Sequence, residues 1–258
     1  MTAAPDGDGG ASPALRSVWL GTVAYGRAWE LQRRLAAARR DGLIDDCVLL
    51  LEHPPVFTMG RNGVAEHVPC GPEVLRAMGA EYVEVDRGGS VTFHGRGQLV
   101  AYPIVRLAEV FPVPGAPGQG DVLRYLRALE AALCEVCSVH GVAARQRPPY
   151  TGAWVGRDKV AAIGVKLSGG VTQHGVALNV SSEPLAWFAR VVPCGIDDGG
   201  VTSLEREGAS GLDACAVSDL LAQRLAAQLG RRLLPADAGL RRLVEVPAPV
   251  VAGETTAA

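Results

Sequence analysis

The sequence has no long apolar run and no large excess of charge. In the 258-residue chain no apolar run reaches the length of about 18 residues that indicates a membrane-spanning helix. The formal net charge is -2, and no dense cluster of Lys and Arg with interleaved aromatic residues occurs. Such a cluster is the usual footprint of a nucleic-acid-binding surface. We therefore expect no membrane and no nucleic acid among the partners of this protein.

The chain also lacks a recognisable export signal. Residues 1–16, MTAAPDGDGGASPALR, carry acidic residues, Pro and Gly where a signal peptide would have a basic start and an apolar run. We expect a cytoplasmic protein, with residues 1–15 as a disordered leader and residues 247–258 as a disordered tail. Residues 16–246 contain no repeat and no long linker, so they should form a single domain, with the Pro/Gly-rich residues 112–120 as a surface loop.

Cysteine is too sparse for a disulfide framework. Six cysteines occur in a long chain without an export signal, so they are expected to be free thiols. Cys134 and Cys137 form a CxxC motif, but apolar residues run through the same segment at helical spacing. With no second ligand pair at zinc-site spacing, this motif is more typical of core packing than of a metal site. We expect no metal.

The hydrophobic patterns predict helices mixed with strands. Helical spacing occurs over residues 26–40, 121–139 and 213–229. Short apolar or β-branched runs predict strands over residues 47–51, 82–85, 90–93, 99–104, 153–155, 160–165 and 171–179. A hairpin around residues 156–158 would place Lys159 at the start of a strand. No regular βαβ alternation occurs, so the pattern favours the α+β class.

Lysine is almost absent. Of the 25 basic residues only two are lysine, Lys159 and Lys166, and both lie in the segment GRDKVAAIGVK. One explanation is chance and solvent exposure. The other is chemical, because a lysine can lose its proton when it is buried, whereas an arginine stays protonated. The residues alone leave both explanations open.

Three segments have the composition of a binding pocket. Residues 86–104 place His94 between glycine pairs, and residues 170–182 place His174 and Gly175 inside a strand, where glycine allows another group to approach closely. Residues 191–205 carry Cys194 in a Pro-Cys-Gly turn, which could expose a thiol nucleophile. Each of these side chains could equally be structural. Separately, the segments do not name a reaction.

Five segments together resemble a known family. LEHPPVFTMGR, RGGSVTFHGRGQLVAYP, KVAAIGVK, HGVALNV and PCGIDDGGVTSL are similar, in order and spacing, to the lipoyl(octanoyl) transferases of lipoate biosynthesis. The resemblance covers about residues 17–235. It implies a single α+β domain of the biotin/lipoyl ligase-like type, with a mixed sheet flanked by helices, and a relationship in fold to lipoate-protein and biotin-protein ligases.

The resemblance also implies an activity and its partners. Octanoyl-acyl carrier protein would donate an octanoyl group to a specific lysine of lipoyl domains, in 2-oxoacid dehydrogenase complexes and in the glycine cleavage H protein. No cofactor and no ATP would be needed. The catalytic residues implied by the family motifs are Cys194, which would carry the acyl thioester, and Lys159. The implied substrate-binding residues are Arg87, Gly88, Gly89, Ser90, Val91, Thr92, Phe93, His94, Ala162, Ile163, Gly164, Gly175, Val176 and Ala177.

These residue types suit acyl transfer. A free thiol with a pKa near ~8.5 is only slightly ionised at neutral pH, so a neighbouring cation would increase the reactive fraction of Cys194. Lys159 could supply that charge, and it could also exchange protons with the incoming lysine, which an arginine could not do. Lys166 is interpreted as a solvated charge or a charge at the edge of the acyl pocket.

Two residues depart from the family pattern. Arg96 stands where the family usually has proline in HGPGQ, which adds a charge and puts the conformation of that loop in question. Asp158 precedes Lys159 where a basic or polar residue is more usual. A carboxylate facing Lys159 would keep the lysine protonated, but successive strand residues face opposite ways, so Asp158 is expected to point outward.

Three alternative functions remain at this point. A lipoate or biotin ligase would form an acyl-adenylate from ATP and would not need a cysteine in a Pro-Cys-Gly turn. A closer variant would move octanoyl between two lipoyl domains. A non-catalytic module would bind the acyl carrier or the lipoyl domain without forming an acyl-enzyme; the presence of both Cys194 and Lys159 argues against it.

Overall fold

A mixed eight-stranded sheet forms the centre of the fold. The computed structural model describes residues 12–191 and 199–245. The strand order in the sheet is β11-β1-β2-β6-β10-β9-β8-β7. β1 is parallel to β2 and β11, and the other neighbours are antiparallel. The strands are β1 (Ala14–Thr22), β2 (Asp46–Glu52), β6 (Gln98–Ile104), β7 (Arg145–Arg147), β8 (Tyr150–Val155), β9 (Asp158–Ser168), β10 (Val171–Asn179) and β11 (Arg232–Pro235).

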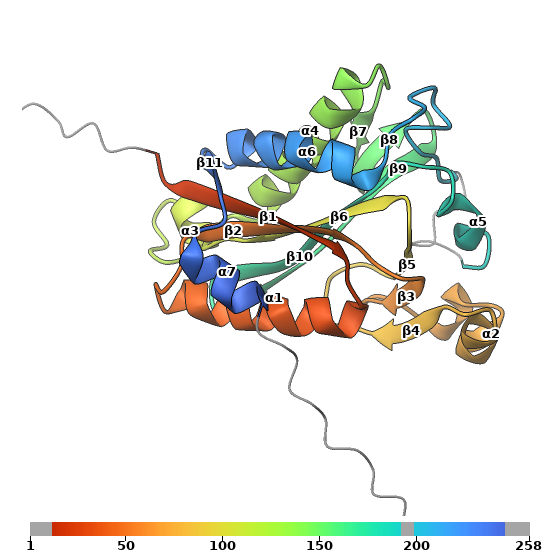
Figure 1. Ribbon diagram of the computed structural model, residues 1–258, viewed down its shortest axis with the longest axis horizontal. Helices are drawn as coiled ribbons and strands as arrows, with labels where there is room; N and C mark the ends of the chain where they lie inside the picture. Colours follow the sequence, from red (N-terminus) through yellow and green to blue (C-terminus); the bar gives the residue numbers. More distant parts are fainter. Residues whose placement is uncertain (1–11, 192–198, 246–258) are drawn as a thin grey trace, which may run out of the picture.

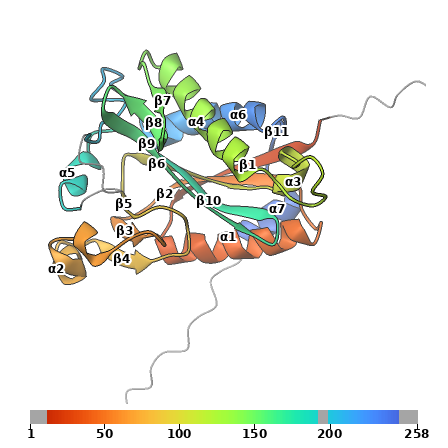
Figure 2. The ribbon, with the colours of Figure 1, turned by 180° about the vertical axis from the view of Figure 1, so that it is seen from behind.

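Helices cover both faces of this sheet (Figures 1 and 2). α4 (Val122–Val139) and α6 (Ala214–Gln228) lie against each other on one face. α1 (Tyr25–Arg40) lies on the other face, where α7 (Ala238–Glu245) packs beside it, and the short α3 (Leu107–Val110) follows β6. Aspartates begin the two helices of the first face: Asp121 accepts a hydrogen bond from Arg124 N–H, and Asp213 accepts one from Ala216 N–H. Such caps satisfy backbone donors that the first helical turn leaves unpaired.

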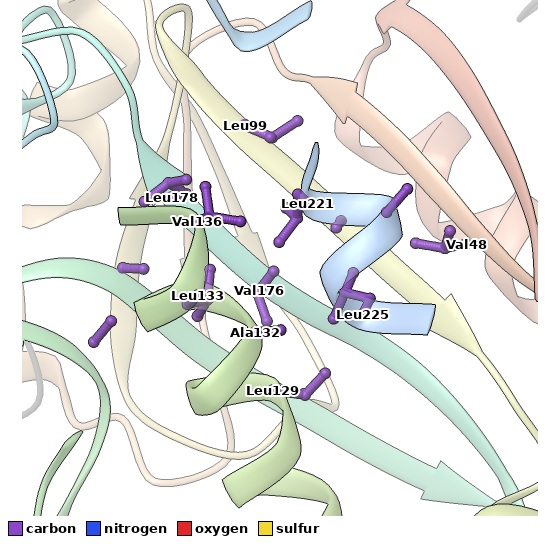
Figure 3. Packing of buried hydrophobic residues seen from close by; sticks show 14 of the residues in the cluster. Val48, Leu99, Leu129, Ala132, Leu133, Val136, Val176, Leu178, Leu221 and Leu225 are labelled. Atoms are coloured by element: carbon purple, nitrogen blue, oxygen red, sulfur yellow. The ribbon is translucent and has the colours of Figure 1, made fainter. Parts of the chain in front are cut away.

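Alternation along the strands supplies two hydrophobic cores. In β2, Val48 and Leu50 pack under α4 and α6, whereas Leu49 and Leu51 pack under α1. Because successive strand residues point to opposite faces, one apolar run serves both layers. Figure 3 shows the first core, where side chains from α4 and α6 meet those of the sheet. Each fully buried leucine there contributes about 1.5–3 kcal/mol to folding.

A second, three-stranded sheet extends from one end of the main sheet. Its order is β4-β3-β5, with β3 (Val56–Met59), β4 (Glu81–Glu84) and β5 (Val91–His94). The short helices η1 (Ala65–His67) and α2 (Gly71–Ala77) join β3 to β4, and α5 (Leu185–Phe188) packs against β5. An aromatic cluster fills this part of the fold: the rings of Phe93 and Trp187 stack with centroids 5.2 Å apart. β5 therefore contributes side chains both to this aromatic core and to the wall of the pocket described below.

The predicted helices and strands are confirmed within a few residues, and the α+β class is confirmed. The hairpin that places Lys159 near the start of β9 is also confirmed. The boundary of the leader is wrong by two residues, because β1 begins at Ala14 and Leu15 is fully buried. β1 and β3 were not expected, since polar or small residues interrupt their apolar patterns. The expected tail, residues 247–258, lies outside the described residues.

Buried ion pairs hold the start of β2. The Asp46 side chain is 1% exposed and accepts hydrogen bonds from the guanidinium groups of Arg39, at 2.7 Å, and Arg231, at 2.8 Å. The backbone N–H of Arg106 donates a third, at 3.1 Å. One carboxylate thereby links α1, β2 and the segments that precede α3 and β11.

The cysteines of the described segments are free thiols, as expected. Cys137 is fully buried against α6, and burial raises its pKa to about 12. Cys134, on the same helix, is half-buried and packs against the same core. The packing interpretation of the CxxC motif is therefore confirmed. Among residues 12–191 and 199–245, no helix is both long and apolar enough to cross a bilayer.

Candidate active site

A pocket opens where the small sheet meets β9 and β10. Twelve of the fourteen substrate-binding residues implied by the resemblance line it, together with Lys159. They are Arg87, Gly89, Ser90, Val91, Thr92, His94, Ala162, Ile163, Gly164, Gly175, Val176 and Ala177. Three segments that are far apart in the sequence therefore form one cavity.

Two of the fourteen residues do not line the pocket. The N–H of Gly88 donates to the carbonyl of Val165, which ties the loop before β5 to β9. The ring of Phe93 faces the aromatic cluster around Trp187, on the opposite side of β5 from its neighbours Thr92 and His94. Alternation along β5 explains this placement, because one residue in two must face the core. Phe93, implied as a substrate-binding residue, therefore lies in the core of the small sheet and not in the pocket wall.

Cys194 lies outside the described residues, which leave out residues 192–198. Residues on both sides of that segment reach the pocket. Phe188 precedes the segment and Val201 follows it, and both line the same cavity as Lys159. Val201 also forms a parallel β-bridge with Lys159.

Glycines in β9 and β10 allow backbone to approach closely. A Cβ atom at Gly175 would lie 2.2 Å from the carbonyl oxygen of Ala101 on β6. Gly164, which pairs with Gly175 across the two strands, would place a Cβ 2.9 Å from Cδ of Arg87. Close approach of neighbouring backbone is a common reason for glycine within a strand. Gly164 therefore lets the loop carrying Arg87 lie directly over the sheet, and Gly175 lets β10 lie close to β6.

Arg87 is a buried anchor in the pocket wall. It is 6% exposed, and its guanidinium donates to the carbonyl oxygen and the hydroxyl of Thr58 on β3 and to the carbonyl of Gly88. Its position fixes the loop between β4 and β5 against both sheets. The charge of Arg87 also lowers the pKa of nearby histidines, because two cations close together disfavour each other.

Lys159 is held by backbone on two sides. Its N–H donates to the carbonyl of Gly200, and its own carbonyl accepts from the N–H of Thr202. Its ammonium nitrogen lies 4.7 Å from the centre of the Trp154 ring, within cation–π range. Arg147 lies 5.0 Å from the centre of the same ring. Lys159 thus stands beside the residues that follow the segment carrying Cys194.

Asp158 does not line the pocket that Lys159 lines. Its carboxylate accepts a hydrogen bond from the N–H of Gly200 at 2.8 Å. The side chain therefore helps to fasten the 199–202 segment to β9. This placement agrees with the expectation that Asp158 points away from Lys159.

The second lysine is paired, not solvated. Lys166 is 18% exposed in its side chain and donates to Asp86, whose other oxygen lies 3.1 Å from Nε2 of His174. Partial burial raises the pKa of the Asp86 carboxyl, but hydrogen bonds from Lys166 and His174 outweigh it and hold the pKa below its ordinary value. His174 has a φ of 56°, in the left-handed region that non-glycine residues rarely adopt. The interpretation of Lys166 as a solvated charge is wrong.

Several polar residues of the pocket wall were missed. Tyr25 begins α1, Tyr102 lies on β6, and Gln98 and Asn179 begin and end strands. Their side chains meet only because the two sheets join here. Gln98, in the HGRGQ motif, had a signal in the resemblance. Tyr102, in RGGSVTFHGRGQLVAYP, and Asn179, in HGVALNV, also lie within segments that carry the resemblance, whereas Tyr25 had no such signal.

The two histidines that line the pocket, His94 and His174, and the neighbouring His53 are buried and held neutral. Burial lowers the pKa of His53 to about 4 and that of His174 to about 4, in the second case against the raising effect of Asp86. His94 is lowered well below its ordinary value, first by burial and then by the neighbouring His53. At neutral pH each ring therefore has one N–H donor and one nitrogen acceptor.

Comparison with known proteins identifies the family of this chain. The family model "Lipoyl protein ligase A/B catalytic domain" matches residues 24–226. The chain belongs to this family. The members with reviewed names include an octanoyltransferase of Rubrobacter xylanophilus, 50% identical over 189 residues, which are 72% of this chain and 80% of the relative. An octanoyltransferase of Chloroflexus aurantiacus is 46% identical over 215 residues, 82% and 91% of the two chains.

Solved structures of lipoate protein ligases share the fold. A bipartite lipoate protein ligase of Thermoplasma acidophilum aligns with a TM-score of 0.66 at 16% identity, over 90% of this chain and 91% of its own. A lipoate-protein ligase A bound with ATP aligns with a TM-score of 0.65 at 14% identity, over 90% and 92%. At these identities the likeness concerns the fold alone. The expected relationship in fold to lipoate-protein ligases is confirmed.

Proposed function

We propose that the protein is an octanoyltransferase of lipoate biosynthesis, an acyltransferase that acts on lipoyl domains. The observation that carries this proposal is the 46–50% identity to octanoyltransferases over most of both chains. The finer proposal is that octanoyl-acyl carrier protein is the donor. Lipoyl domains of 2-oxoacid dehydrogenase complexes and of the glycine cleavage H protein are the proposed acceptors.

The pocket suits an eight-carbon acyl chain. Val91, Ile163, Val176 and Ala177 supply apolar surface to the wall of this pocket. Each buried methylene contributes about 0.8 kcal/mol, so a narrow apolar wall can both bind the chain and limit its length. We assign the acyl chain to this wall.

We assign the chemistry to Cys194 and Lys159. The thiolate of Cys194 attacks the thioester carbon of the donor, the acyl–sulfur bond of the carrier breaks, and the released pantetheine thiolate takes a proton. The lysine amine of the acceptor then attacks the Cys194 thioester, an amide forms, and the thiol of Cys194 is released. Lys159 supports the first step as a nearby cation and both steps as a proton carrier. Its place in the pocket, bridged to Val201, favours this assignment.

The test is intact mass after mixing the protein with octanoyl-acyl carrier protein without ATP. One octanoyl group should be added to the wild type and none to Cys194→Ser. Lys159→Arg keeps a cation beside Trp154 but cannot exchange protons, so its overall transfer rate to a lipoyl domain should fall by about 100-fold or more.

Each alternative gives a different result in the same experiment. Transfer that appears only with ATP would indicate a ligase. Binding of the carrier without any acylation would indicate a non-catalytic module. If octanoyl is transferred faster from an octanoylated lipoyl domain than from octanoyl-acyl carrier protein, the donor is the lipoyl domain and not the carrier protein.

A further inference from the structure

Three buried side chains form a hydrogen-bonded relay in the wall of the pocket. Nδ1 of His94, at the end of β5, lies 2.7 Å from Oε1 of Gln98. Nε2 of Gln98 lies 2.9 Å from Oδ1 of Asn179, at the end of β10. His94 is 7% exposed, Gln98 1% and Asn179 3%. The relay crosses from the small sheet into the main sheet.

Two backbone carbonyls fix the direction of every bond in this relay. Nδ2 of Asn179 donates to the carbonyl of Thr202 at 2.9 Å, and Nε2 of Gln98 also donates to the carbonyl of Phe93 at 3.2 Å. A carbonyl oxygen only accepts hydrogen bonds, so the amide nitrogen of each side chain must face it. Each amide oxygen must then face the other way. The orientation of both amides follows from the backbone and not from an arbitrary choice of their end atoms.

The relay therefore determines the tautomer of His94. Oε1 of Gln98 can only accept, so Nδ1 of His94 carries the proton and donates it. Nε2 is then left with a lone pair. Within residues 12–191 and 199–245 no hydrogen-bond donor is placed on Nε2, and His94 lines the pocket. Nε2 of His94 is thus a hydrogen-bond acceptor in the pocket wall.

The groups around His94 keep this ring uncharged. The His53 ring centre lies 5.7 Å away, and the Tyr25 ring stacks at 6.1 Å. Burial lowers the pKa of His94 most, and His53, Arg87 and His174 lower it further, whereas Gln98 raises it. The lone pair is therefore available throughout the neutral range.

An acceptor at this point selects among the groups that enter the pocket. An acyl chain offers no hydrogen-bond donor, and a thioester carbonyl is itself an acceptor that a lone pair repels. In the first half-reaction the amide N–H groups of the pantetheine arm lie on the far side of the thioester sulfur, whereas the attacking amine of the second half-reaction carries its N–H donors on the reacting nitrogen. A hydrogen bond from one of them to Nε2 of His94 would hold that nitrogen at a fixed point of the pocket wall.

We propose that Nε2 of His94 accepts a hydrogen bond from the amino group of the incoming lysine, and that Gln98 and Asn179 are positioning residues for His94. This inference rests on the proposed octanoyl transfer and concerns its second step. The C–N bond forms, the C–S bond breaks, and the proton lost by the amine passes to the released thiolate. His94 keeps its own proton on Nδ1 throughout.

The test measures the two half-reactions separately on the full chain. Acylation is followed with octanoyl-acyl carrier protein alone, and transfer is followed by adding a lipoyl domain to the isolated octanoyl-enzyme. His94→Ala should slow the transfer step about 10-fold or more and change acylation by less than about 3-fold. Equal slowing of both steps, or of neither, would overturn the proposal.

Gln98→Glu tests the relay itself. A carboxylate facing Nδ1 stabilises the imidazolium and raises the pKa of His94. Below that pKa Nε2 carries a proton and can no longer accept. The transfer rate of the variant should therefore rise with pH between about 5 and 8, whereas the transfer rate of wild type should show no such rise. An unchanged pH profile would overturn the positioning role.

His53→Gln is the matched control. His53 is also a buried neutral histidine, but both of its nitrogens are partnered, one by the carbonyl of Val23 at 2.6 Å and the other by the hydroxyl of Tyr102 at 2.8 Å. This variant should lose stability and keep the wild-type ratio of the two rates. If wild type itself forms no octanoyl-enzyme, the proposed function fails. If wild type reacts and the His94 variants change neither step selectively, only the relay inference fails.

Discussion

Gly175→Ala should destabilise the fold more than an ordinary substitution of glycine in a strand. Gly175 sits in β10 between β6 and β9, and its φ does not require glycine. The constraint is space, because an added Cβ would lie 2.2 Å from the carbonyl oxygen of Ala101 and 2.7 Å from Cδ of Pro103. Both obstacles belong to β6, which is buried along its whole length.

The distance sets the size of the effect. A carbon and a carbonyl oxygen rarely approach closer than about 3.3 Å. A Cβ only 2.2 Å from that oxygen therefore requires β6 and β10 to separate by about 1 Å. Overpacking of a core costs about 1–3 kcal/mol, and stretching the ladder beside the Val176 and Ala101 pair adds about 1 kcal/mol. We expect a loss of about 3 kcal/mol in the free energy of unfolding, and a decrease in Tm of about 10 °C.

Urea denaturation followed by circular dichroism measures this loss, with Gly88→Ala as the control. A Cβ at Gly88 would meet only the carbonyl oxygen of Val165, at an ordinary 3.5 Å, so that variant should stay within about 0.5 kcal/mol of wild type. A Gly175→Ala protein as stable as Gly88→Ala would refute the steric explanation of this glycine.

Two further predictions concern charge. The pKa values of His53 and His174 are lowered to about 4, so below the unfolded value of about 6.5 the unfolded chain binds more protons, and the free energy of unfolding should fall as pH drops from about 6.5 to about 4. Stability that stays constant from pH 7 to pH 5 in urea titrations would contradict this, and His53→Gln should flatten the dependence. Asp46→Asn leaves two buried arginines without their carboxylate, so the same assay should show a loss of about 3–5 kcal/mol, and a loss below about 1 kcal/mol would show that the ion pairs are not needed.

Periodicity in the sequence was enough to predict the long elements of the main fold. α4 and α6 combine a clear apolar spacing with an aspartate cap, and their bounds differ from the predicted ranges by a single residue at each end or less. β10 was predicted with the correct bounds. β1 escaped because Arg16, Ser17 and Gly21 interrupt its pattern, although pairing with both β2 and β11 stabilises it. Long-range pairing of this kind leaves little local signal.

The site was only partly predictable for a similar reason. The family motifs identified the segments that form the pocket, and glycines marked where backbone approaches backbone. The motifs did not show that Phe93 faces the core and His94 the pocket, because this depends on the register of β5. The roles of Asp86 and Asn179 depend on contacts with residues far away in the sequence: Asp86 pairs with Lys166 and His174, and Asn179 with Gln98 on the neighbouring strand. No spacing along the chain encodes those contacts.

The strand order of the main sheet has a practical consequence for handling this protein. β1 and β11, which carry the chain toward the two ends of its described part, lie together at one edge of the sheet, and β9, which carries Lys159, lies near the other edge (Figure 1). A fluorophore or a solid support attached to a side chain at that edge would lie on the far side of the sheet from Lys159. The two protein substrates proposed here could then dock on an immobilised enzyme without obstruction, which makes surface-based binding measurements with either carrier suitable for this chain.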